Sequence, residues 1–185
     1  MKRKLNSKVI IAAEGKTEKT YFGNFSRRDK RVSFSHGNET DIIGIFNNLV
    51  SYINKHAISA IDGDLIYLVV DIDNDKGKIT KLDALKKQAD ELGIKLIYSN
   101  ACFEVWFLLH FLPKTANMSS ENVEKELKKH IPNYNKGMDV YSLLESKKDD
   151  AIKNAKNAFN NAFQNETTST SSYSTVYEII EEFQD

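Results

Sequence analysis

The chain has 185 residues, of which 41% are hydrophobic, and its 26 basic and 26 acidic side chains cancel in formal charge. This length allows one domain with a sizeable core, and no apolar run approaches the length of a membrane span. The balanced charge gives no overall sign of a nucleic-acid partner, although a locally basic face stays open. The N-terminal stretch has too short an apolar run for a signal peptide, and the single cysteine, Cys102, excludes an internal disulfide. We therefore expect a cytoplasmic protein without membrane contact, in which Cys102 is a small buried residue rather than a nucleophile.

Apolar runs alternate with amphipathic stretches through the first hundred residues. The expected strands lie at 8–13, 31–37, 65–70 and 94–100. The stretches between them space their apolar side chains as helices do, at 17–28, 38–57 and 78–93. This alternation is typical of an α/β sandwich with a mostly parallel four-stranded sheet.

The second half of the chain is predicted to be helical. "CFEVWFLLHFL" (102–112) is apolar almost all round, which predicts a deeply packed helix. The remaining expected elements are a helix at 119–131, two helices or one broken helix at 139–164, a polar loop at 165–173 and a closing helix at 174–183. Without repeats or a clear linker, we expect one domain over 1–185, with an α/β core at 1–100 and an integral helical elaboration at 101–185.

Carboxylates follow two of the predicted strands at the point where each strand ends. Glu14 follows the first strand in "AAEGKTEKTYF", and Asp71, Asp73 and Asp75 follow the third in "VVDIDND". If those strands are neighbours, Glu14, Asp71 and Asp73 meet at one edge of the sheet, and a persisting strand would point Asp71 and Asp73 to the same side. Close carboxylates repel one another, and oxygen ligands of this kind suit Mg²⁺ or Mn²⁺ rather than zinc.

Simpler interpretations of these acidic residues stay open. An acid near a helix N-terminus is favoured by the helix dipole, which alone could explain Glu14. The "DIDND" cluster could be a solvated turn, because Asp and Asn are ordinary turn residues. Beside Glu14, Gly15 allows a tight turn and Lys16 can contact a phosphate.

The segment "SNACFEVWFLLHF" contains polar residues in the most apolar part of the chain. Burying Glu104 there is costly unless it is paired or bound to a metal, so we expect a metal ligand or a general base that orients water. Asn100 is expected at the same end of the sheet. For His110 a hydrogen-bonded core histidine is the favoured interpretation over a ligand. The chain contains no GxxxxGK[ST], GxGxxG, CxxC or HExxH motif.

Two of these segments together resemble the Toprim domain of topoisomerases, DnaG-type primases and OLD-family nucleases: an apolar strand ending in Glu-Gly, then about sixty residues later a strand ending in DxD. More specifically, "AAEGKTEKTYF", "VVDIDND", "SNACFEVWFLLHF" and "SSYSTVYEII" resemble the RloB-like family from about residue 8 to the C-terminus. The chain departs from the family pattern where Ala101 replaces a usual proline and "SSYS" replaces an asparagine–proline turn. Neither departure touches a carboxylate.

The resemblance implies a Toprim-like three-layer sandwich and a set of active-site roles. It implies Glu14, Asp71 and Asp73 as metal ligands, Glu18 as a supporting ligand and Glu104 as a further active-site carboxylate. Lys16 or Lys136 would neutralise charge on the transferring phosphate. The basic run that includes Arg27 and Arg28 would contact backbone phosphates, unless it is only a solvated helix end.

The resemblance also implies a function. We expect a Mg²⁺- or Mn²⁺-dependent nuclease that hydrolyses DNA or RNA in phage defence by abortive infection, with an AAA-type ATPase as partner. The competing hypothesis is a non-catalytic Toprim-like sensor module that docks on the ATPase, and a third is a regulatory protein whose acidic cluster serves only solubility. DNA or RNA as substrate, and a homo-oligomer as the assembled state, are left open.

Overall fold

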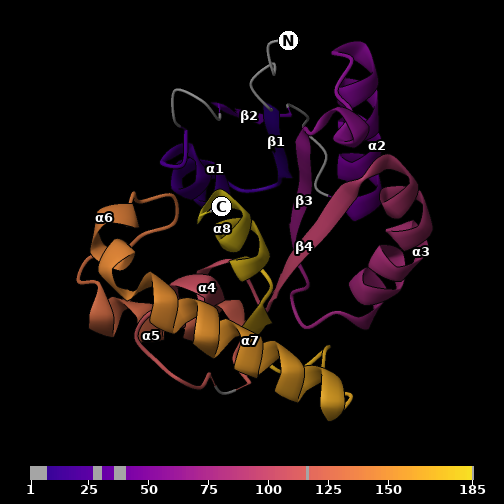
Figure 1. Ribbon diagram of the computed structural model, residues 1–185. Coiled ribbons are helices and arrows are strands. Elements are labelled where there is room, and N and C mark those ends of the chain that lie inside the picture. The colour runs from indigo at the N-terminus through magenta and orange to yellow at the C-terminus, as the bar shows by residue number, and fades with distance from the viewer. Residues whose placement is uncertain (1–7, 27–30, 36–40, 116, 185) are drawn as a thin grey trace.

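The computed structural model describes the chain except residues 1–7, 27–30, 36–40, 116 and 185 (Figure 1). The strands are β1 (Lys8–Ala13), β2 (Arg31–Phe34), β3 (Leu65–Asp71), β4 (Ile94–Asn100) and β5 (Tyr173–Ser174). The α-helices are α1 (Lys16–Gly23), α2 (Ile42–Lys55), α3 (Lys76–Leu92), α4 (Glu104–Leu108), α5 (Ser120–His130), α6 (Tyr141–Leu144), α7 (Lys148–Gln164) and α8 (Tyr177–Gln184). Two short 3₁₀ helices lie at η1 (Ala60–Asp62) and η2 (Glu145–Lys147).

The strands form one sheet in the order β2-β1-β3-β4-β5. The first four are parallel, as the alternation of strands and helices predicted, and β5 pairs antiparallel with β4. The expected number of four strands is therefore wrong by one. The extra strand has only two residues, too few to show a sequence pattern, and it is held by long-range contacts such as the buried pair of Ser99 and Ser174 hydroxyls at 2.8 Å.

Helices cover both faces of the sheet and make three layers. Side chains on one face of the strands pack with α2 and α3, and those on the other face pack mainly with α1, α4, α5 and α8. Burial on both faces explains why the strands read as continuous apolar runs. In β3, Tyr67 and Val69 belong to the α1 and α4 side. Since side chains alternate along a strand, Asp71 points to that side too.

The helical predictions hold with adjusted boundaries. Asp41 caps α2 through a hydrogen bond from Ile43, and Gly93 ends α3 in a left-handed conformation with φ of 64°. The segment 139–164 is a broken helix, divided into α6, η2 and α7. The apolar segment forms only the short α4, yet all of 101–110 is buried. No helix in the described part of the chain is long and apolar enough to cross a membrane.

Candidate active site

The carboxylates that follow β1 and β3 lie at the point where the strand order reverses. β1 pairs with β2 on one side and with β3 on the other, and Ala13 lies opposite Val69. The first and third strands are thus neighbours, which is the condition for these acids to meet at one edge. Glu14 follows Ala13 directly and Asp71 lies two residues beyond Val69, so both occupy the carboxyl edge where open α/β sheets bind their ligands.

Glu18 is held inside the protein by the turn that precedes α1. Its side chain is 4% exposed, and its carboxylate folds back over Gly15. A Cβ atom at Gly15 would lie 2.3 Å from Glu18 Oε2, so only glycine leaves room for this arrangement. Burial, reinforced by the charges of Glu104 and Glu14, raises the pKa of Glu18 to about 7, although its own main-chain N–H favours the charged form.

Glu104 is the buried centre of a small hydrogen-bond network. It is 3% exposed, and its Oε1 accepts hydrogen bonds from Thr17 Oγ1 at 3.2 Å and from the Tyr134 hydroxyl at 3.0 Å. Thr17 Oγ1 in turn accepts the main-chain N–H of Gly137 at 3.0 Å. Glu104 therefore joins α4 to the start of α1 and to the loop after α5, as a buried carboxylate requires.

Asp71 has an unsatisfied oxygen within this group of acids. Its Oδ1 is buried and has no hydrogen-bond partner among the described residues. Burial, and then the charges of Glu18 and Glu104, raise the pKa of Asp71 well above its usual range. An orphaned buried carboxylate oxygen costs free energy, so the cluster of Glu14, Glu18, Asp71 and Glu104 is incomplete as an internal polar network.

Two lysines flank the cluster. Lys136 is exposed, and although partial burial alone would lower its pKa, the negative groups around it, Glu104 first among them, together raise it. The Lys16 side chain lies against Gly137, where a Cβ atom would come within 2.8 Å of Lys16 Cδ. Gly137 has φ of 81°, so glycine is favoured there both by its backbone conformation and by the space available.

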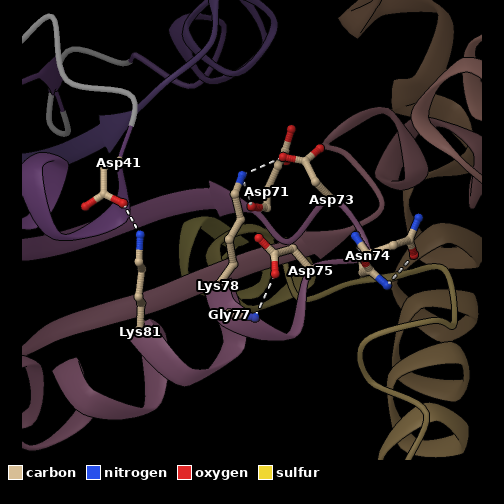
Figure 2. A network of polar contacts seen from close by, with 9 residues as sticks. Asp41, Asp71, Asp73, Asn74, Asp75, Gly77, Lys78 and Lys81 are labelled. Carbon is tan, nitrogen blue, oxygen red and sulfur yellow. Dashed lines mark hydrogen bonds and ion pairs between the residues drawn. The ribbon is translucent and has the colours of Figure 1, made fainter.

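Asp73 and Asp75 belong to a turn rather than to the strand (Figure 2). β3 ends at Asp71 and Asp73 adopts a left-handed φ of 56°, so the strand does not persist and the condition for the two side chains to point to the same side is not met. Figure 2 shows Lys78 reaching both the Asp73 carboxylate and the main-chain oxygen of Asp71. Asp75 caps α3 by accepting the N–H of Gly77 at 2.7 Å, a structural role.

Two further candidates have structural contacts of their own. Asn100 is fully buried: its Oδ1 accepts the N–H of Asn74 at 2.7 Å, and its amide donates to the oxygen of Ser171 at 2.9 Å. His110 lies in the core with Nδ1 2.9 Å from the oxygen of Trp106, and burial lowers its pKa to about 4. Both hold the fold around the site, which for His110 is the favoured interpretation of the sequence. Burial also raises the pKa of Cys102, which makes it a poor nucleophile.

The structure brings together residues that the sequence pattern did not single out. Thr17 and Tyr134 bind Glu104, and Lys78 binds Asp73. Thr17 lies within "EGKTE", but nothing in the sequence places Tyr134 beside it. The predicted phosphate contacts Arg27 and Arg28 lie outside the described residues.

The donor set suits a hard divalent cation by its chemistry. Within the described residues, no three His, Cys, Asp or Glu side chains converge as they would around a bound ion. However, the cluster supplies only oxygen donors, and the orphaned Asp71 Oδ1 and the mutual repulsion of the acids are what a bound cation would relieve. Asp71, Glu18 and Glu14 supply oxygen atoms of the kind that such an ion prefers, and their side chains would have to converge further to hold it.

The fold and the cluster define a class: a three-layer α/β protein whose mostly parallel sheet carries buried acids at its switch point. Residues 9–183 match the family described as RloB-like protein, nearly the whole chain, and the protein belongs to that family. The resemblance drawn from the four sequence segments is thereby confirmed. Neither the curated proteins nor the solved structures contain a match.

Proposed function

We propose that this protein is a divalent-metal-dependent nuclease that hydrolyses phosphodiester bonds of DNA or RNA. The observation that supports it most is the buried Oδ1 of Asp71, which has no partner in the described part of the chain and lies within a group of acids whose ionised forms repel one another. Such a cluster is unfavourable for the metal-free protein, and perturbed carboxylates at a switch point are typical of functional sites.

Each residue of the cluster has a proposed part in this reaction. Asp71, Glu18 and Glu14 hold Mg²⁺ or Mn²⁺, which when bound supplies a Lewis acid and an activated water. Asp73 can join them when Lys78 releases it. Glu104, fixed by Thr17 and Tyr134, positions the attacking water, and Lys16 and Lys136 offset the charge that develops on the phosphate.

The biological setting is proposed from the family resemblance. A Toprim-like arrangement, a place in phage defence by abortive infection and an AAA-type ATPase partner all follow from the likeness to RloB-like proteins. Phosphodiester hydrolysis is proposed from the same likeness, and the acidic cluster supports a reaction that depends on a divalent metal.

A sensor module that docks on the ATPase without cutting is the second candidate. It is favoured by the hydrogen bonds that already engage Glu104 and by the ion pair of Lys78 with Asp73. These contacts would hold the acids in place in a protein that never binds an ion.

Metal binding and cleavage separate the two candidates. For a nuclease, calorimetry detects Mn²⁺ binding, and cleavage of labelled DNA or RNA falls at least a hundredfold in Asp71→Asn and in Glu14→Ala. Asp62→Asn, at an exposed position in η1, is the matched control and retains activity. Absence of Mn²⁺ binding would instead favour the sensor module, and cleavage that survives both variants would exclude this site.

A further inference from the structure

A polar groove of about 790 Å³ lies beside α7, between this helix and the loops that follow α4 and α7. Among the described residues that line it, none is acidic and none is aromatic. Its cations are Lys114 and Lys153, and its other polar groups are amides and hydroxyls. In a chain with as many acidic as basic residues, this makes the groove a locally basic surface.

One face of α7 contributes a row of side-chain amides to this groove. Asn157, Asn160, Asn161 and Gln164 are exposed and follow one another at helical spacing. Within the described part of the chain, no hydrogen bond engages the side chains of Asn157, Asn160 or Gln164. Asparagine lowers helix stability relative to alanine, so Asn157 and Asn160 carry a cost that no side-chain hydrogen bond within the described residues offsets.

The groove is connected to the acidic edge through two hydrogen bonds. Ser172, which lines the groove, accepts the N–H of Met118 at 3.0 Å, and the oxygen of Met118 accepts the side-chain amide of Asn74 at 3.1 Å. Asn74 directly follows Asp73, and both lie in the turn drawn in Figure 2. The part of the groove at Ser172 therefore lies close to the turn that follows β3.

We propose that this groove binds the sugar–phosphate backbone of a nucleic-acid duplex, which is the substrate class of the proposed nuclease and rests on that function. Amides, hydroxyls and lysines are the groups that contact phosphate and sugar. Proteins that bind single strands add aromatic side chains on which bases stack, and this groove has none among its described residues. The lining from Lys153 to Asn165 spans about 18 Å of helix, which matches about five phosphates along one strand of B-form DNA.

The first test measures binding without catalysis. Fluorescence anisotropy in EDTA compares labelled 20-base-pair DNA and RNA duplexes with their own single strands. At least one duplex binds at least tenfold more tightly than its strands. Binding of neither duplex, or tighter binding of the strands, overturns the proposal.

Paired variants then locate the binding surface. Asn157→Ala with Asn160→Ala weakens duplex binding at least fivefold, while the melting temperature does not fall. The matched control is Asn47→Ala with Asn54→Ala, two exposed asparagines of α2 on the other face of the sheet, which leaves binding unchanged. If both pairs bind duplex as the natural protein does, the α7 groove is not the site.

The salt dependence of binding gives a second, independent readout. Lys114→Gln with Lys153→Gln lowers the slope of log affinity against log salt by about 1.8, as expected for two lost phosphate contacts, whereas exposed Lys55→Gln with Lys87→Gln does not. Metal-dependent cleavage that is unaffected by the groove variants overturns the groove and leaves the nuclease standing. Duplex binding in the groove without any cleavage supports the groove and overturns the nuclease.

Discussion

Replacing Glu18 by glutamine removes one charge from the buried carboxylate cluster while keeping the size and shape of the side chain. The pKa of Glu18 is raised from its ordinary value of 4.5 to about 7, because it is buried beside Glu104 and Glu14. Ionising it in the metal-free folded protein therefore costs about 3 kcal/mol more than in the unfolded chain. Since the folded pKa is the higher one, the stability that this group contributes is full below pH 4.5 and is lost as the pH rises through about 7.

The expected result is that Glu18→Gln stabilises the metal-free protein in alkaline but not in acidic solution. At pH 8 the free energy of unfolding rises by up to about 3 kcal/mol, and at pH 4.5 the difference from the natural protein vanishes. Urea unfolding in EDTA, followed by the fluorescence of the single, fully buried Trp106, measures both values.

A divalent ion should remove most of this difference in stability. Mn²⁺ at one hundred times its dissociation constant would stabilise the natural protein by about 2.7 kcal/mol at pH 8, and Glu18→Gln by much less. The control is exposed Glu91→Gln, which changes stability by no more than about 0.5 kcal/mol at either pH. If Glu18→Gln raised the free energy of unfolding equally at pH 4.5 and pH 8, or did not raise it at all, the reasoning about the buried charge would be refuted.

Three other predictions address the support of the cluster and the core beside it. Gly15→Ala destabilises the protein by about 1–3 kcal/mol, measured by urea unfolding, and displaces the Glu18 carboxylate, which weakens Mn²⁺ binding in calorimetry. An unchanged free energy of unfolding and an unchanged Mn²⁺ affinity would show that the turn accommodates a Cβ atom. Tyr134→Phe removes one hydrogen bond from Glu104, so it lowers stability by about 1 kcal/mol and weakens cleavage more than it weakens metal binding; equal losses would argue against a role in positioning Glu104. Because the pKa of His110 is lowered to about 4, its stability contribution is present above pH 6.5 and falls as the pH drops towards 4. The difference in free energy of unfolding between the natural protein and His110→Gln therefore shrinks by up to about 3 kcal/mol as the pH falls across that range. A difference that stays constant with pH would contradict this effect of burial.

The local pattern of the sequence determined much of the fold. Continuous apolar runs predicted β1, β3 and β4 because both faces of the sheet are buried, and helical spacing predicted α2, α3 and the broken helix at 139–164. The order of strands and helices then implied a parallel sheet, in which Glu14 and Asp71 meet at one edge if their strands are neighbours. These features depend on neighbouring residues along the chain or on the order of strands and helices, so they could be predicted from the sequence alone.

Only the tertiary structure decided what each polar side chain contacts. Thr17 and Tyr134 meet Glu104 across 87 and 30 residues of sequence, and the two-residue β5 forms by pairing with β4, which is distant along the chain. Asp73 left the expected strand geometry because the chain turns directly after Asp71. Hydrogen bonds and desolvation depend on three-dimensional neighbours, and therefore the sequence could locate the acidic edge but not its buried, unpartnered oxygen.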